Sequence, residues 1–182
     1  MVHNPKYSQA GMAWCAEAAI GLIFNLVERA NARISRKKLR VLFAKEYRDE
    51  VSPQRISKMV YELERRKYIE ICEGDSVKLT NKAKIKIIDR VVAAQNPDCK
   101  FRIVSFDIPE TKRTNRNNFR RAIKRMGFKQ IQKSLWVTHS NVGEYVELAA
   151  KEYLVPDYIA YFVADASNVD AHINGVLLAK DQ

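Results

Sequence analysis

The sequence predicts an α+β protein made of an N-terminal winged helix-turn-helix followed by a ferredoxin-like βαββαβ domain. Three observations predict it. The first 95 residues hold three helical patterns, two short alternating strands and a further helical pattern. The rest alternates strand and helix in the order βαββαβ. A polar turn at residues 95–98 separates the two parts, so we expect domains at residues 1–95 and 96–182.

The first part opens with three helices. Residues 13–30 are apolar around most of the helix surface, which is typical of a buried or interface helix. Ser35 is positioned to cap a second helix. Ser52, followed by Pro53, is a strong start signal for a third. The inward positions of this third helix are apolar, namely Ile56, Val60 and Leu63.

A hairpin follows the third helix. Residues 68–72 alternate as a strand, residues 73–75 form a turn and residues 76–79 return as a second strand. Thr80 or Asn81 then caps a helix over residues 82–92. Three helices, a hairpin and a final helix are the order of a winged helix-turn-helix.

The second part begins with an apolar strand at residues 100–106. Next come a basic helix at 113–126 and a long strand at 128–138, which we expect to bend or split near Ser134. A helix at 141–153 and a strand at 158–164 complete the pattern. Residues 167–182 are expected to form a short helix or an arm.

The charge favours a polyanionic partner. The net charge is +11 and the pI is about 9.6. Residues 1–95 carry 19 basic and 11 acidic side chains, and residues 112–133 carry nine Lys or Arg and no acid. Such a balance is typical of proteins that bind nucleic acid or an anionic membrane surface. Because the charge coincides with DNA-binding patterns, double-stranded DNA is the expected partner.

Other classes are disfavoured. The apolar stretch at residues 10–27 contains Glu17 and Asn25, is short for a membrane span and lacks the flanks of a signal peptide. We therefore expect a cytoplasmic protein without a membrane partner. Three Cys and three His are scattered, so neither a disulfide framework nor a zinc site is indicated.

Candidate DNA-binding residues lie on three of the expected elements. Gln54, Arg55 and Lys58 occupy the first turns of the third helix, where Gln and Arg can read adenine and guanine edges. Further candidates for phosphate contacts or stacking are Arg36, Lys37, Lys38, Tyr61, Lys78, Arg116 and Arg120. The alternative is that these charges are solvated on a protein-interaction module, or that the basic helix binds an acidic partner.

Asp107 is the one candidate for metal chemistry. It follows the strand at 100–106 and precedes Ile108 and Pro109, which ends the strand by withholding a ladder donor. A carboxylate at this position could hold a metal ion. It could instead cap the following turn or pair with Arg113 or Arg116, and we favour this structural role.

A set of motifs carries a family resemblance. They are Phe106-Asp107-Ile108-Pro109, then Arg113, Arg116 and Arg120, Gly127-Phe128, and Gln132-Lys133-Ser134-Leu135-Trp136. Together they resemble the core of the CRISPR spacer-acquisition protein Cas-two, and equally the Cas-two-like central domain of PaaX-type transcriptional repressors, over roughly residues 99–166.

The resemblance implies two kinds of function. The long basic segment in front favours a PaaX-like repressor, which implies a cofactor-free homodimer on a near-palindromic operator. The alternative is a Cas-two-like endonuclease that uses Mg²⁺ or Mn²⁺, with Asp107 as both metal ligand and catalytic residue paired across a dimer. A non-catalytic scaffold that partners a CRISPR integrase is a third possibility. PaaX repressors continue into a further helical region and this sequence stops at Gln182, so we expect no acyl-CoA site.

Overall fold

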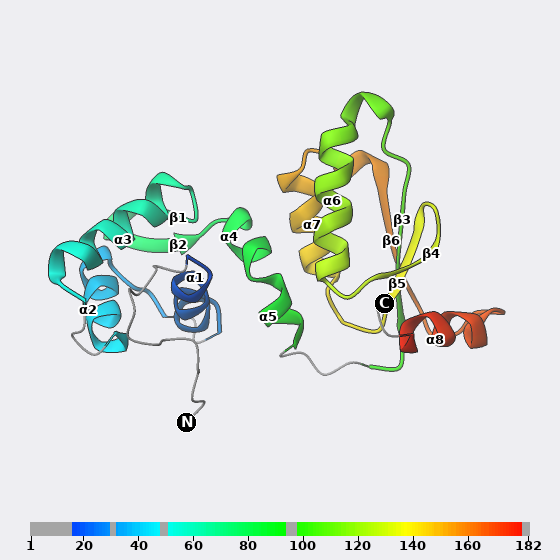
Figure 1. Ribbon diagram of the computed structural model, residues 1–182, viewed down its shortest axis with the longest axis horizontal. Helices are drawn as coiled ribbons and strands as arrows, with labels where there is room; N and C mark the ends of the chain where they lie inside the picture. The colour runs from blue at the N-terminus through cyan, green and yellow to red at the C-terminus, as the bar shows by residue number, and fades with distance from the viewer. Residues whose placement is uncertain (1–15, 30–31, 48–50, 94–97, 180–182) are drawn as a thin grey trace. The chain divides into compact units, whose positions relative to one another are not determined.

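The computed structural model describes residues 16–29, 32–47, 51–93 and 98–179 (Figure 1). The chain divides into two compact units, residues 1–83 and 84–182, and each is described by itself. The turn at residues 95–98, apart from Asp98, lies outside the described residues, as do residues 13–15 and 30 of the first expected helix. Within the described ranges, no helix has the length and apolar character needed to cross a membrane.

Three helices build most of the first unit. They are α1 (Ala16–Phe24), which continues into a π-helical turn at Asn25–Arg29, α2 (Arg36–Glu46) and α3 (Pro53–Arg65). The start signals act as the sequence indicates. The Ser35 hydroxyl accepts from the backbone N–H of Lys38 at 3.2 Å, and the Ser52 hydroxyl accepts from that of Arg55 at 3.4 Å. Their shared core is apolar and includes Ala19, Ile20, Ile23, Leu39, Phe43, Ile56, Val60 and Leu63.

An antiparallel hairpin of β1 (Ile69–Cys72) and β2 (Ser76–Leu79) follows α3. Gly74 in its turn has a φ of 71°, a conformation that glycine adopts without strain. The backbone N–H of Val77 donates to the Ile34 carbonyl at 2.7 Å, so the hairpin is fastened to the segment before α2. Helices and hairpin thus appear in the order that the sequence predicts.

The prediction of one helix over residues 82–92 is wrong. The structure has two short helices, α4 (Asn81–Lys86) and α5 (Ile88–Ala93). The Arg125 guanidinium donates to the carbonyls of Ile85 and Lys86 at 3.2 and 2.9 Å and to the Asp89 carboxylate at 2.8 Å. A side chain that takes carbonyls from the helical ladder breaks a helix. Residues 84–93 therefore belong to the second unit through a contact nearly forty positions away.

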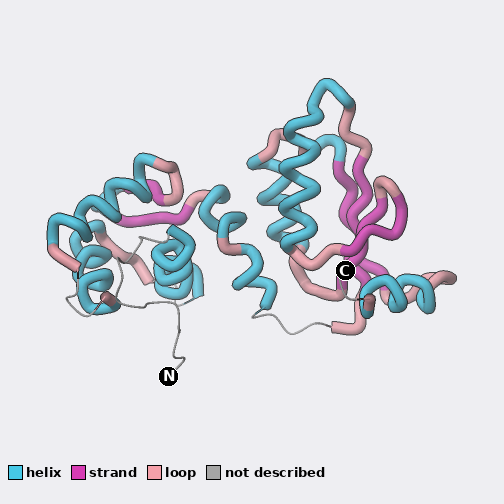
Figure 2. The backbone as a smooth tube through the Cα atoms, in the orientation of Figure 1, coloured by secondary structure: helices cyan, strands magenta, loops and turns pink. Residues whose placement is uncertain are grey.

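The second unit contains a four-stranded antiparallel sheet (Figure 2). Its strands follow the spatial order β4–β5–β3–β6, which leaves β4 and β6 at the edges. Along the chain the elements are β3 (Phe101–Phe106), α6 (Arg113–Arg125), β4 (Lys129–Gln132), β5 (Leu135–Thr138), α7 (Gly143–Glu152) and β6 (Ile159–Ala164). The long strand expected at 128–138 is indeed split around Ser134.

Side chains pack on both faces of this sheet. On one face Phe106 of β3 meets Phe119 of α6 edge-to-face at 5.5 Å and lies 6.5 Å from the ring of Trp136 on β5. On the other face Phe101 and Val137 are buried with Ile173 of a last helix, α8 (Asp170–Leu178). The short helix expected after residue 167 thus covers part of the sheet face that α6 and α7 leave free.

Candidate nucleic-acid interface

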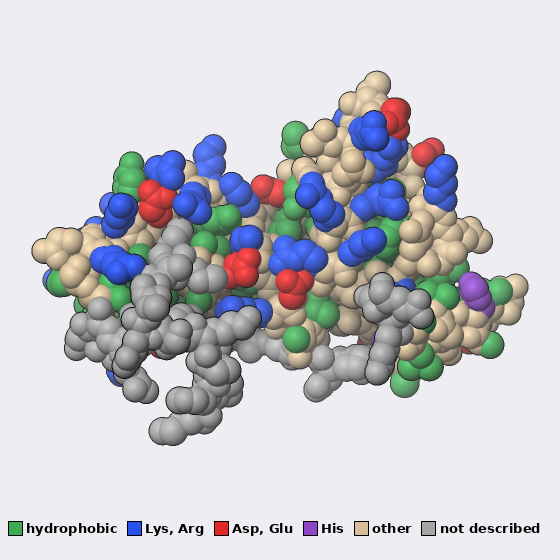
Figure 3. Space-filling model, in the orientation of Figure 1, with side chains coloured by type: hydrophobic (Ala, Val, Ile, Leu, Met, Phe, Trp, Pro, Cys, Tyr) green, Lys and Arg blue, Asp and Glu red, His purple; other side chains and the backbone are tan. Residues whose placement is uncertain are grey.

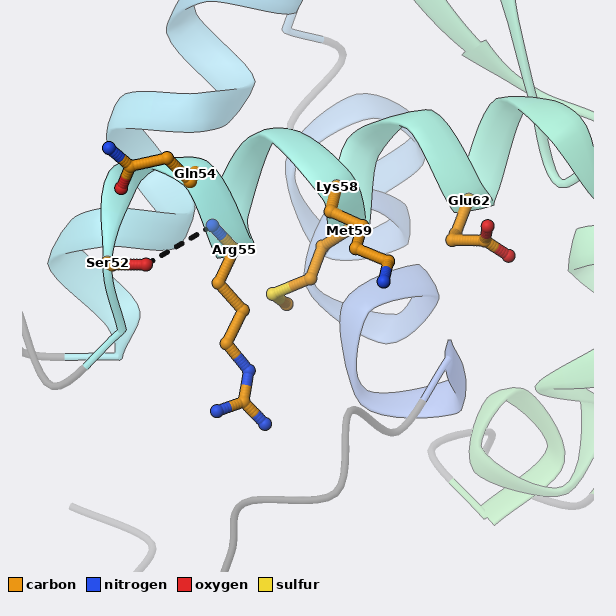
Figure 4. Close-up of a pocket in the computed structure, with 6 residues that line it drawn as sticks. All are labelled: Ser52, Gln54, Arg55, Lys58, Met59 and Glu62. Carbon is orange, nitrogen blue, oxygen red and sulfur yellow. Dashed lines mark hydrogen bonds between the residues drawn. The ribbon is translucent and has the colours of Figure 1, made fainter.

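The first turns of α3 present a row of polar side chains to solvent. Gln54, Arg55 and Lys58 are all exposed, as the sequence indicates (Figure 4). The opposite side of α3 is buried through Ile56, Met59, Val60 and Leu63. Since this helix is strongly amphipathic, burial of its apolar stripe fixes which residues face outward.

The same row borders a pocket of about 520 Å³. Its described lining consists of Ser52, Gln54, Arg55, Lys58, Met59 and Glu62 (Figure 4). Glu62 is its only described acid, and it accepts from Arg65 at 2.8 Å and from Arg66 at 3.2 Å. The hydrogen bonds from these two guanidinium groups, that of Arg65 foremost, lower the pKa of Glu62. The row is therefore cationic at its start and is closed by a carboxylate already compensated by two arginines.

Further basic groups lie on neighbouring elements of the same unit. Lys37 and Lys38 on α2 and Lys78 on β2 are exposed, and Tyr61 on α3 is 60% exposed. Arg36 differs from these, because its guanidinium donates to both carboxylate oxygens of Glu64 at 2.9 and 3.0 Å. Both bonds come from the same nitrogen, Nη2, and they join the start of α2 to the end of α3.

The surroundings of Asp107 differ from the expected pairing. Its backbone N–H donates to the Tyr158 carbonyl at 3.1 Å, whereas its exposed carboxylate meets neither Arg113 nor Arg116 in the described chain. Both arginines turn to Glu110 instead, Arg116 at 2.7 Å and Arg113 at 3.6 Å. The Arg116 hydrogen bond lowers the pKa of Glu110. Sequence spacing had favoured the wrong acid because Asp107 remains tied to the end of β3.

These donors do not fit a divalent metal within one chain. Mg²⁺ and Mn²⁺ need several oxygen ligands. No group of three or more His, Cys, Asp and Glu side chains gathers in the part of the chain that the structure describes. Glu110, the nearest acid in sequence, is already held by two arginines. We therefore derive no metal-dependent step from this site.

Lys and Arg side chains gather over the basic helix α6 (Figure 3), and they make two kinds of contact. Arg116 donates to the Ile108 carbonyl at 3.2 Å as well as to Glu110, so it holds the loop after β3. The Arg120 guanidinium instead lies 5.7 Å from the centre of the Trp136 ring, and the Lys124 ammonium lies 5.8 Å from it. Lys124 and Trp136 were not among the binding candidates that the sequence indicated. The four-residue spacing of Arg120 and Lys124 was the available signal for the pair of cations.

The comparison with protein families bears on the second unit. Residues 94–175 match the family model described as the PaaX protein central Cas2-like domain. This part of the chain is a PaaX-type Cas2-like domain. The match includes Asp107, α6 and the whole sheet, and it confirms the resemblance expected over residues 99–166. The chain is thus an α+β protein with a PaaX-type Cas2-like domain, and the first unit lies wholly outside the match. No curated protein and no solved structure matches the chain.

Proposed function

We propose that this chain is a sequence-specific DNA-binding transcriptional regulator that acts as a homodimer. In this proposal the first unit forms a winged helix-turn-helix, and residues 96–182 of the second unit form a ferredoxin-like dimerisation domain. The PaaX-type domain favours a regulatory role for the whole chain. No cofactor is required, and double-stranded DNA is the partner.

One observation carries the proposal, namely the exposed row of Gln54, Arg55 and Lys58 on the first turns of α3. The N-terminal turns of a recognition helix enter the major groove and contact base edges. There an Arg can bind guanine and a Gln can bind adenine through two hydrogen bonds each, while Lys58 can reach guanine or a phosphate. The buried stripe on the other side of α3 holds this row in a fixed orientation.

The neighbouring groups receive supporting roles. Lys37, Lys38 and Lys78 contact phosphates and set the register on the duplex without reading sequence. Tyr61 adds a phosphate contact or stacks. Because Arg36 is held by Glu64, we assign it the task of fixing the angle between α2 and α3.

A homodimer is supported by the edge of the sheet. β6 is an edge strand, and its Phe162 and Val163 are both 53% exposed. An exposed apolar edge strand is a ready surface for self-association. Two copies related by a two-fold axis would present two copies of α3 to a near-palindromic site.

Binding measurements on two duplexes test the proposal. A duplex selected from a random library is compared with an unselected one, at a fixed salt concentration and without divalent metal. We expect Arg55→Ala or Lys58→Ala to reduce the preference for the selected duplex by about 10- to 100-fold, which corresponds to about 1–3 kcal/mol per lost base contact.

A matched control lies on the same helix. Arg65→Ala removes the same charge from the opposite end of α3, about 15 Å further along the axis. Because Arg66 still donates to Glu62, this variant is expected to leave the preference intact. Equal binding of selected and unselected duplexes by the unaltered protein would overturn the proposal. So would a preference that survives both Arg55→Ala and Lys58→Ala.

A further inference from the structure

Two cations of α6 are held over one buried aromatic ring. Arg120 and Lys124 lie one helical turn apart, and both lie within 6 Å of the centre of the Trp136 ring at 5.7 and 5.8 Å. Trp136 itself is 1% exposed and is packed beside Phe106. The ring is therefore a fixed platform that restrains the two side chains without neutralising them.

The other arginines of α6 already have polar partners. Arg113 and Arg116 pair with Glu110, Arg125 pairs with Asp89, and Arg121 donates to the side chain of Asn118. In the described chain, Arg120 and Lys124 form no ion pair with a carboxylate. A cation–π contact is an attraction between the charge and the ring, so it leaves N–H donors of both side chains available for an acceptor.

The proximity of Arg120 and Lys124 carries an electrostatic cost. Like charges four residues apart on a helix repel each other, and residues 112–133 contain no acid that could relieve the repulsion. An external anion would remove this repulsion. The pair of Arg120 and Lys124 thus has the properties of a ligand-binding contact.

The chemistry of the surface selects the class of anion. The side chains of α6 that are not buried are all Arg, Lys, Asn or Thr. Such a face lacks the apolar groups that a helix inserts into a bilayer. Guanidinium and ammonium groups presented along a rigid helix suit phosphate oxygens, to which Arg donates two parallel hydrogen bonds.

We propose, relying on the function above for the identity of the polyanion, that Arg120 and Lys124 on the Trp136 platform bind the phosphate backbone of double-stranded DNA independently of sequence. The Cas2-like domain then contributes directly to DNA affinity. This contact adds to the affinity for every duplex equally, because phosphates carry no sequence information.

Salt dependence of binding by the full chain tests this contact. The dissociation constant is measured on a random-sequence duplex over a series of salt concentrations. Each phosphate neutralised contributes about 0.9 to the slope of log affinity against log salt, so Arg120→Gln with Lys124→Gln should reduce the slope by about two. The exchanged pair, Arg120→Lys with Lys124→Arg, keeps both charges and should retain the slope.

A second pair on the same helix is the control. Arg113→Gln with Arg121→Gln removes the same charge from exposed positions of α6 that already have polar partners. We expect this control pair to change the slope by less than about half of the change in the variant with Arg120→Gln and Lys124→Gln. Circular dichroism and thermal melting establish that each variant is folded, and a misfolded double variant is replaced by the single variant Lys124→Gln, for which the expected change is about one.

The outcomes separate this inference from the proposed function. An unchanged slope in Arg120→Gln with Lys124→Gln overturns the inference, and so does an equal loss in the control pair. The ratio of affinities for selected and unselected duplexes should stay the same in the Arg120 and Lys124 variants. If the unaltered protein binds selected and unselected duplexes equally, the regulator proposal fails, even where the salt slope of the variants falls as expected.

Discussion

Packing of α6 on the sheet depends on Phe119, and its truncation gives the sharpest stability prediction. The side chain is fully buried and meets Phe106 edge-to-face at 5.5 Å. Phe→Ala changes in a core cost about 3–5 kcal/mol through lost burial and the cavity left behind. Loss of the aromatic pair is part of that cost, because such pairs contribute about 0.5–1.5 kcal/mol.

The assay follows the fluorescence of Trp136 during urea unfolding. The chain has two tryptophans, so Trp14→Phe in every sample leaves Trp136 as the single reporter of the second unit. For a urea dependence of about 1–2 kcal/mol per molar, a loss of about 4 kcal/mol lowers the midpoint by roughly 2–4 M. If Phe119→Ala leaves no folded population, Phe119→Leu is measured instead, with an expected loss of about 1–2 kcal/mol.

A matched aromatic on the same sheet is the control. Phe162 is 53% exposed on β6, and Phe162→Ala at low protein concentration should change stability by less than about 1 kcal/mol. A Phe119→Ala loss below about 1 kcal/mol, or one equal to that of Phe162→Ala, would refute the described packing of α6.

Three further predictions concern other parts of the chain. The Arg102 side chain is 5% exposed and donates to both oxygens of Asp98 at 2.6 and 2.5 Å. These hydrogen bonds lower the pKa of Asp98 from 3.8 to about 2. Since the pKa is depressed in the folded state, the stabilisation is present above about pH 4 and is lost as the pH falls from about 4 to about 2. In urea unfolding at several pH values, the free energy of unfolding should therefore fall more steeply with acid in the unaltered protein than in Asp98→Asn. An equal dependence on pH in the two proteins would contradict the pairing. Ser52→Ala removes the cap of α3 and should cost about 0.5–1 kcal/mol, while Ser52→Asn should cost much less; equal thermal melting of the two variants would show that the bond to the Arg55 N–H contributes nothing. An added Cβ at Gly175 of α8 meets no atom within 4 Å. Gly175→Ala should therefore stabilise α8 by about 0.5–1 kcal/mol and slow hydrogen exchange of its amides by roughly two- to five-fold. Faster exchange would contradict the absence of a steric clash at this position.

Local signals in the sequence predicted much of the fold. Ser35, Ser52 and Pro53 mark helix starts because capping depends on residues within one turn. The expectation that the strand pattern over residues 128–138 bends or splits near Ser134 rested likewise on local sequence, and the structure shows the split. The exposure of Gln54, Arg55 and Lys58 followed from the apolar stripe of α3.

Long-range contacts account for what the sequence did not predict. The break between α4 and α5 follows from Arg125, which lies 39 and 40 positions from the carbonyls it binds. Arg36 pairs with Glu64 over 28 positions, so this ion pair could not be read from the residues next to Arg36 in the sequence. The Trp136 platform is similar, because only the folded sheet brings β5 beneath α6.

The most direct test of the central claim is a comparison of selected DNA motifs. The claim is that the first turns of α3 read bases in the major groove. The unaltered protein and Arg55→Ala are each used to select duplexes from a random library. We expect a near-palindromic motif from the unaltered protein, and loss of the guanine preference at one position of each half-site in Arg55→Ala, with the other positions kept. An identical motif from both proteins, or no motif from the unaltered one, would contradict the account.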